Sequence, residues 1–264
     1  DIAWPFVGEM FGGVQRFTPR VQFVATPPLS NLEVPNEDSR SIELEDANVF
    51  SLNRFPGNDR FEDGARITYG AEYALDLPRF SLRTSLAQSY RLNREPTLFP
   101  TGTGLAERFS DFVGRTEIRY GRFLALTHRF RIDKDNGELR RNEIDFTIGS
   151  RTTYAEIGYL RLNRDITFNV EDLRDREELR SSARVAIGNY WSVFGSAVID
   201  LTSAEEDPIS QSDGFEPVRT RLGFGYSDEG LEFGFTWRRD YDDTGDARRG
   251  NTFLVRFALT NLGR

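Results

Sequence analysis

Residues 218–239 read VRTRLGFGYSDEGLEFGFTWRR, and this stretch decides the fold. Apolar side chains occupy every second position on both sides of the polar residues 227–230, as Leu222, Phe224 and Phe233 illustrate. A period of two is typical of a β-strand with one apolar and one polar face. Because the intervening SDEG sequence is rich in turn-forming residues, the stretch predicts an antiparallel β-hairpin.

The same alternation recurs from one end of the chain to the other. It predicts a short first strand around Trp4 and Phe6 that ends in a tight turn within residues 8–13, followed by strands at 14–26, 64–75, 80–91, 110–120, 123–132, 138–148, 152–162, 177–187, 190–201, 218–226, 231–239 and 250–260. The connections between these strands are alternately short and long. Short turns at one membrane face and long loops at the other are typical of a transmembrane β-barrel.

A soluble β-sandwich would give the same alternation, because its strands also have one buried face. The predicted strands, however, are longer than the average of about 5–6 residues and match the ~9–11 residues of a tilted membrane strand. A sandwich also has no physical reason to sort its loops by length. We therefore predict an all-β fold, an antiparallel transmembrane β-barrel of about thirteen strands.

Composition excludes several other classes of protein. The mean hydropathy is -0.52 and hydrophobic residues make up 38% of the chain, so an apolar helix of ~20 residues is not expected. There is no cysteine and a single histidine, which disfavours disulfides and Cys- or His-rich metal sites. A net charge of -8 disfavours general nucleic-acid binding. We expect no cofactor and no metal.

Loop lengths also indicate an orientation. If the short turns are periplasmic, the last strand leaves the C-terminus in the periplasm and the first strand starts outside the cell. Because single-chain bacterial barrels have an even number of strands, an odd count predicts that earlier strands are missing. Residues 1–264 are therefore expected to be the C-terminal portion of a larger outer-membrane barrel.

Residues 27–63 are expected to form a long extracellular loop. The aromatic residues of this loop and its Pro56-Gly57 turn predict that it is ordered and packs on the barrel.

The polar face of the predicted strands carries many charged residues. Those expected to face the lumen are Arg66, Arg115, Glu117, Arg119, Glu143, Asp145, Arg219, Arg221 and Arg238. The arginines could bind a phosphorylated glycolipid, since their planar forks suit phosphate. The alternative is a charge lattice that solvates the barrel wall and satisfies itself.

Two further features allow a chemical and a structural interpretation. His128 could be a catalytic base, but no serine nucleophile with an orienting partner shares its face, so we expect a packing role and no enzyme activity. The acidic residues within 133–138 lack the twelve-residue spacing of a calcium loop. They favour a β-hairpin around the Asn136-Gly137 pair instead.

Several segments resemble the C-terminal barrel of the lipopolysaccharide-assembly outer-membrane protein family LptD (OstA/Imp). The resemblance is carried by PNEDS at 35–39, NVFSLNRFPGNDR at 48–60, residues 64–70, QSYR at 88–91, RRNE at 140–143, SDE at 227–229 and residues 259–263. The long loop holds its most specific part, and the matching residues there are Asn36, Glu37, Asp38, Asn53, Arg54, Phe55, Gly57, Asp59 and Arg60.

This resemblance implies a function in Gram-negative membrane biogenesis. Such a protein takes lipopolysaccharide from a periplasmic bridge, docked on an N-terminal domain missing here, and inserts it into the outer leaflet. An LptE-type lipoprotein plugs the lumen, and the lipid leaves through a lateral gate between the first and last strands of a barrel of about twenty-six strands. The gate strand here would contain Gly250, Asn251, Thr252, Phe253, Val255 and Phe257.

One feature departs from the family pattern. The family often carries cysteines after the Asp-Glu of the late turn, whereas Gly230 follows Glu229 here and the chain has no cysteine. The resemblance therefore does not imply that this chain matures through a disulfide between the late turn and the periplasmic domain. The alternative function is a porin-like or substrate-specific outer-membrane channel, which needs the same wall but is disfavoured by the odd strand count.

Overall fold

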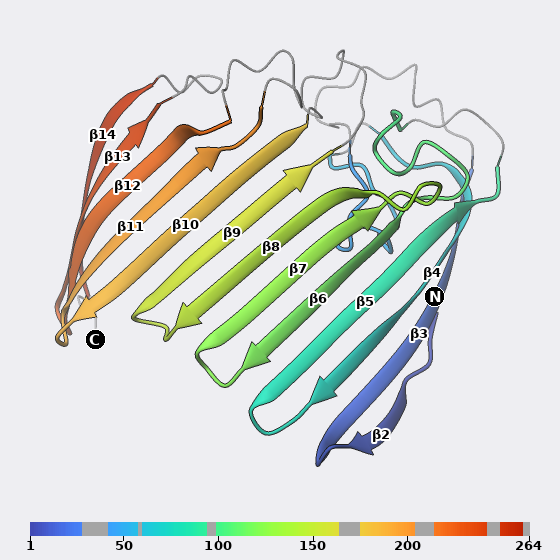
Figure 1. The fold of residues 1–264 in the computed structure, drawn as a ribbon, viewed down its shortest axis with the longest axis horizontal. Coiled ribbons are helices and arrows are strands. Elements are labelled where there is room, and N and C mark those ends of the chain that lie inside the picture. The colour runs from blue at the N-terminus through green and yellow to red at the C-terminus, as the bar shows by residue number, and fades with distance from the viewer. Residues whose placement is uncertain are drawn as a thin grey trace. The chain divides into compact units, whose positions relative to one another are not determined.

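The computed structural model describes residues 1–27, 42–57, 60–93, 99–163, 175–203, 214–241 and 249–260. These residues form fourteen strands in one sheet, in which β1 and β2 both pair with β3 and every later strand follows in chain order (Figure 1). All the strand pairings with a resolved register are antiparallel. The predicted all-β antiparallel class is confirmed. Among the described residues, no helix is long and apolar enough to cross a membrane.

The chain divides into two compact units. The first unit contains residues Asp1–Gly121, Leu126–Ile144 and Arg161–Asp175. Its strands are β1 (Ile2–Ala3), β2 (Phe6–Met10), β3 (Gly13–Thr26), β4 (Gly64–Asp76), β5 (Phe80–Arg91), β6 (Phe112–Tyr120), most of β7 (Leu124–Ile132) and the first half of β8 (Leu139–Gly149).

The second unit contains residues Arg122–Ala125, Asp145–Leu160 and Arg176–Arg264. Besides the remainder of β7 and β8, it holds most of β9 (Tyr154–Leu162), then β10 (Arg176–Ile187), β11 (Trp191–Asp200), β12 (Glu216–Ser227), β13 (Leu231–Asp240) and β14 (Gly250–Leu259).

The first two strands are a single strand interrupted by a proline. Ile2 lies opposite Val21 and Phe6 opposite Phe17, so one register runs through both strands. The Trp4 amide donates to the Pro19 carbonyl at 3.1 Å, and only Pro5, which has no N–H group, breaks the ladder. Counting this pair as one gives thirteen strand positions in the described residues, as predicted.

The first hairpin turn lies within the predicted segment 8–13 but is shorter than that segment. Strand β2 continues to Met10, and the turn is made by Phe11 and Gly12 with φ angles of 52° and 77°. Two successive positive φ angles are the signature of the two-residue turn that matches strand twist. Glycine is the residue that such a turn favours, and Phe11 adopts the left-handed region beside it.

Large apolar side chains are exposed on one face of the strands. Examples are Phe23 on β3, Ile157 on β9 and Val193 on β11, which are 60%, 55% and 46% exposed. A soluble protein rarely leaves so much contiguous apolar surface in water, whereas lipid requires it. The polar residues alternate with these on the opposite face, which we call the polar face.

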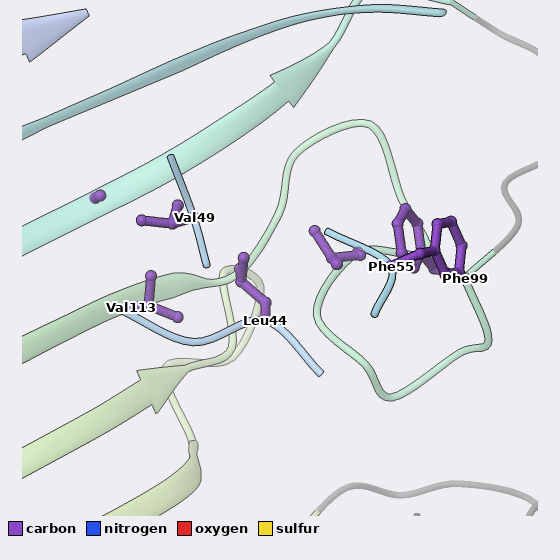
Figure 2. Packing of buried hydrophobic residues seen from close by; sticks show 7 residues of the cluster. Leu44, Val49, Phe55, Phe99 and Val113 are labelled. Carbon is purple, nitrogen blue, oxygen red and sulfur yellow. The ribbon is translucent and has the colours of Figure 1, made fainter. Parts of the chain in front are cut away.

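The buried apolar cluster of the first unit is built by loops rather than by facing sheets. Figure 2 shows Leu44, Val49 and Phe55 from one loop beside Phe99 from another, close to Val113 of β6. Leu105 and Ala87 of β5 complete the cluster. Residues 42–57 of the long loop therefore pack on the strands, while residues 28–41 and 58–59 of the predicted loop lie outside the described residues.

Candidate functional site

The long loop is held in shape by Asn53 of the NRFPG motif. Its side-chain oxygen accepts hydrogen bonds from the amides of Phe55 and Glu62 at 3.3 and 3.0 Å. Its side-chain amide donates to the carbonyls of Phe55 and Arg60, both at 3.2 Å. One residue thus ties the two ends of the turn that contains Gly57, whose φ angle is 84°.

Arg54 and Arg66 form a buried ion cluster around Glu62. The Arg54 guanidinium donates two hydrogen bonds to the Glu62 carboxylate, at 2.8 and 2.7 Å. Arg66 on β4 lies 3.2 Å from the same carboxylate and donates to the carbonyls of Ser51 and Leu52, both at 2.7 Å. A bidentate arginine–carboxylate pair is strong and geometrically specific, so the cluster fixes the loop on the sheet.

Phe55 provides the apolar contact of the motif. Its ring stacks on Phe99 with the ring centroids 4.7 Å apart and the planes within 5° of parallel (Figure 2). The Arg54 guanidinium lies 5.9 Å from the centroid of the same Phe99 ring. The motif therefore joins two loops that are separate in sequence.

A second buried ion cluster anchors the start of this loop. Arg131 on β7 is fully buried, and its guanidinium lies 3.3 Å from Glu43 and 3.6 Å from Asp111. Arg141 on β8 lies 3.7 Å from Glu43 and 2.9 Å from Glu45. Glu43 thus bridges two arginines on neighbouring strands.

Two carboxyl groups of these loops have perturbed acidity. Burial raises the pKa of Glu45 above its usual value, although Arg141 opposes the shift. Burial likewise raises the pKa of Asp111, against the effect of Arg131. For each of these acids, the loss of water therefore outweighs the nearby positive charge.

A cavity of about 580 Å³ remains between the loop and the strands of the first unit. It is lined by Phe50 and Asp46 of the loop and by Arg20 and Glu72 of the strands, among others. The Arg20 guanidinium lies 4.2 Å from the centroid of the Phe50 ring. The lining combines charged side chains with apolar ones such as Val49, Leu86 and Val113.

The remaining predicted charged residues of the first unit pair with acids or bases on the same face. Arg115 and Arg119 both contact Glu117, and Arg115 also lies 4.0 Å from Asp46 of the loop. Glu143 accepts from Arg129 at 3.2 Å and from Arg141 at 2.8 Å. In the described part of this unit, these charged side chains therefore pair with one another and with the loop.

In the second unit the predicted charged residues are less completely paired. Asp145 lies 3.9 Å from Arg180. Asp240 accepts from Arg219 at 2.6 Å and lies 2.7 Å from Arg238. Arg221 forms no ion pair with any residue in the described ranges.

The terminal strand β14 is exposed along its whole length. It pairs only with β13 among the described strands, with Phe253 opposite Trp237 and Val255 opposite Phe235. Phe253, Val255 and Phe257 are all more than 60% exposed. Asn251 accepts a hydrogen bond from the Trp237 indole at 3.0 Å, while Gly250 and Thr252 pair with Asp240 and Arg238 in the register.

His128 and residues 133–138 have structural surroundings. His128 lies 2.9 Å from the Asn142 side-chain oxygen and its ring centroid is 5.4 Å from that of Phe130. Asp133 accepts from the amides of Asp135 and Asn136, and Gly137 has a φ angle of 74°, so this segment is the predicted hairpin. No cluster of three or more His, Cys, Asp or Glu residues in the described ranges could hold a metal ion.

Comparison with known proteins identifies the family. Residues 1–191 match the family described as LptD, LPS transport system D. The chain belongs to the LptD family. Proteins named LPS-assembly protein LptD from Burkholderia thailandensis and Burkholderia pseudomallei (strain K96243) are 26% identical to it over 197 residues, which is 72% of this chain and 24% of theirs. The relative from Polaromonas sp. (strain JS666) is 32% identical over 118 residues, 44% of this chain and 14% of its own.

The chain spans about a quarter of the length of the Burkholderia relatives that it matches. Membership in the LptD family agrees with the all-β sheet and with the class of outer-membrane β-barrels. The matched residues include the whole loop motif and both buried ion clusters. They end before β12, β13 and β14.

Sequence reasoning found the motif of this LptD chain but not its partners. The residues it missed are Glu43, Glu62 and Phe99, which hold the loop on the strands. Acids within a Pro-rich loop were the only available signal, because alternation says nothing about loop side chains. Asn36, Glu37, Asp38 and Asp59 lie outside the described residues.

Proposed function

We propose that this chain forms the C-terminal part of an outer-membrane β-barrel that inserts lipopolysaccharide into the outer leaflet of a Gram-negative bacterium. The observation that carries the proposal is the match of residues 1–191 to the LptD family, together with relatives whose names describe assembly of lipopolysaccharide. The exposed apolar face and the charged side chains of the opposite face support a wall between lipid and water.

The lateral gate is proposed at β14. An end strand can separate from a neighbour at the smallest cost, because every internal strand carries paired amides on both edges. Each unpaired amide in lipid costs several kcal/mol. Phe253, Val255 and Phe257 would contact the acyl chains, while the backbone of Gly250, Asn251 and Thr252 would form the opening edge.

The polar face is proposed to line a hydrated lumen through which the sugars pass. The charged residues Arg66, Arg115, Glu117, Arg119, Glu143 and Asp145, with Arg219, Arg221 and Arg238, would solvate that lumen. An LptE-type lipoprotein would occupy part of it, and a periplasmic domain preceding these strands would receive lipopolysaccharide from the bridge. The long loop would cover the extracellular side.

The same hypothesis places the C-terminus in the periplasm. The Thr260 amide donates to the Gly230 carbonyl at 3.0 Å, so the end of β14 lies beside the short turn between β12 and β13. Short turns are periplasmic in outer-membrane barrels. The final residues would therefore emerge on the periplasmic side.

Locking the gate tests the function. In the full-length protein, Thr252→Cys is combined with a cysteine scanned along the first strand of the barrel, and the pair is oxidised. Surface lipopolysaccharide, measured by surface labelling, should fall strongly in the locked variant and recover on reduction. As a matched control, cysteines at the opposed residues Ala197 and Thr220 lock two internal strands and should leave export unchanged. Normal export with a fully oxidised gate pair would disprove the gate.

A further inference from the structure

One row of polar side chains crosses five strands of the second unit. In the strand registers, Ser182 lies opposite Ser196, Ser196 opposite Arg221, Arg221 opposite Arg238, and Arg238 opposite Thr252. Directly opposed residues point to the same side of a sheet. All five therefore lie on the polar face, and the row ends on the terminal strand β14.

The centre of this row holds an excess of positive charge. Arg221 and Arg238 are directly opposed like charges, an arrangement that destabilises a strand pair. Asp240, two residues along β13, already accepts from Arg219 and lies 2.7 Å from Arg238, so one carboxylate serves two arginines. Arg221 is left without an ion pair to any described residue, and it is half-buried rather than freely extended.

Acids on the neighbouring strands are engaged elsewhere. Glu156 accepts from Ser182 at 2.9 Å. Glu178 contacts Arg176 and Arg180, and Glu232 lies 3.4 Å from Arg256. The arginine pair therefore remains under-compensated within the described part of this unit.

The arginines of this row are partly open to solvent. Arg219 and Arg238 are each more than a third exposed. Toward the short turns, the polar face beside Arg221 is covered by the Phe194 ring, which would lie 2.4 Å from a methyl group added at Gly223. Farther along, Gly225 and Gly234 leave the face open, because a methyl group there would approach no atom closer than 3.4 or 3.8 Å.

We propose that Ser196, Arg221, Arg238 and Thr252 form a binding site for a phosphate monoester. Guanidinium forks match phosphate oxygens in a bidentate manner, and the two flanking hydroxyl groups add donors at either end. A dianion supplies the negative charge that Asp240 alone does not. Resting on the proposed function, the physiological ligand is the phosphorylated headgroup of the transported glycolipid, held beside the terminal strand β14.

Binding measurements on the full-length protein in detergent test this site. The probes are inorganic phosphate, phosphorylated lipid A and the same lipid after enzymatic removal of its phosphates. Arg221→Gln combined with Arg238→Gln should weaken binding of phosphorylated lipid A by about tenfold or more, since hydrogen bonds to charged groups are individually worth about that factor. Arg221→Lys, which keeps the charge but loses the fork, should lie between the wild type and the double variant.

The matched control is Arg239→Gln. Arg239 is adjacent in sequence but lies on the opposite face, with its guanidinium 4.7 Å from the Tyr241 ring centroid. It removes one positive charge from the opposite face and should leave binding unchanged. Resistance to trypsin verifies that each variant is folded, and Arg221→Lys keeps the test informative if the double variant unfolds.

The possible results distinguish inorganic phosphate from the lipid headgroup as the ligand. They also distinguish failure of this site from failure of the proposed transport function. Weakened binding of inorganic phosphate as well as lipid A supports a site for phosphate itself, and weakened binding of lipid A alone assigns the site to the headgroup. Equal binding of all three probes to the wild type and the double variant overturns the site. Failure of the gate-locking experiment with intact, arginine-dependent phosphate binding would instead refute the transport function and leave the site in place.

Discussion

The arginines on the polar faces of the two units have different surroundings. In the first unit, loops cover Arg54, Arg66 and Arg131, which are at most 3% exposed with carboxylates beside them. In the second unit, Arg219 and Arg238 are more than a third exposed and share one carboxylate with each other. The difference teaches that one alternating pattern can encode either a fixed structural lattice or an accessible charged surface.

Removing a buried arginine should give the largest effect. Arg131→Ala removes the fully buried guanidinium that lies beside Glu43 and Asp111, and breaking a buried pair in this way costs about 3–5 kcal/mol. Denaturant unfolding in detergent measures the loss. The matched change Arg221→Ala in the second unit should alter stability by no more than about 0.5 kcal/mol. Similar losses in both variants would abolish the distinction between the two faces.

The loop motif should be the next most sensitive feature. Asn53→Ala deletes four hydrogen bonds, each with a net value of about 0.5–1.5 kcal/mol, so we expect a loss of about 3 kcal/mol. Faster protease cleavage within residues 42–63 reports the loss of loop packing. Asn142→Ala, which removes a single bond to His128, is the control and should leave loop cleavage unchanged.

Substituting one glycine on the polar face of each unit compares how tightly the two faces are packed. A methyl group at Gly70 would lie 2.5 Å from the Leu86 carbonyl and 2.8 Å from the Ala87 Cβ atom, so Gly70→Ala should cost about 2 kcal/mol through overpacking. Gly234→Ala meets no atom within 3.8 Å and should be close to neutral. Equal melting temperatures for the two variants would contradict the packing difference.

The smallest effect is expected at the hairpin acid Asp133. Burial alone would raise the pKa of Asp133, but hydrogen bonds from the amides of Asp135 and Asn136 and from Arg140 hold it below its usual value. The stabilisation is therefore present above the unfolded pKa of about 3.9 and is lost as the pH falls through the lower folded pKa. Asp133→Asn should cost about 1 kcal/mol at neutral pH. Unfolding curves of the variant and the wild type should converge in acid; a constant gap would exclude this titration as the cause.

The fold could be predicted from the sequence because strand alternation is a local signal. The strand predicted at 64–75 is observed as Gly64–Asp76, and the strand at 250–260 as Gly250–Leu259. The first turn was placed too broadly, since a phenylalanine at a positive φ angle has no sequence signal. The ion pairs Arg54–Glu62 and Arg131–Glu43 could not be predicted, because their partners meet only after distant loops have packed.

The loop-built cluster of the first unit also bears on the folding mechanism. Leu44, Phe99 and Val113 come from segments far apart in sequence, so bringing them together requires loop closures whose entropy must be offset by strands that are already paired. These contacts are therefore expected to form after the folding transition state, with low φ-values. Substitutions within the cluster should then accelerate unfolding and leave the folding rate nearly unchanged, which makes this cluster a determinant of how long the native state persists.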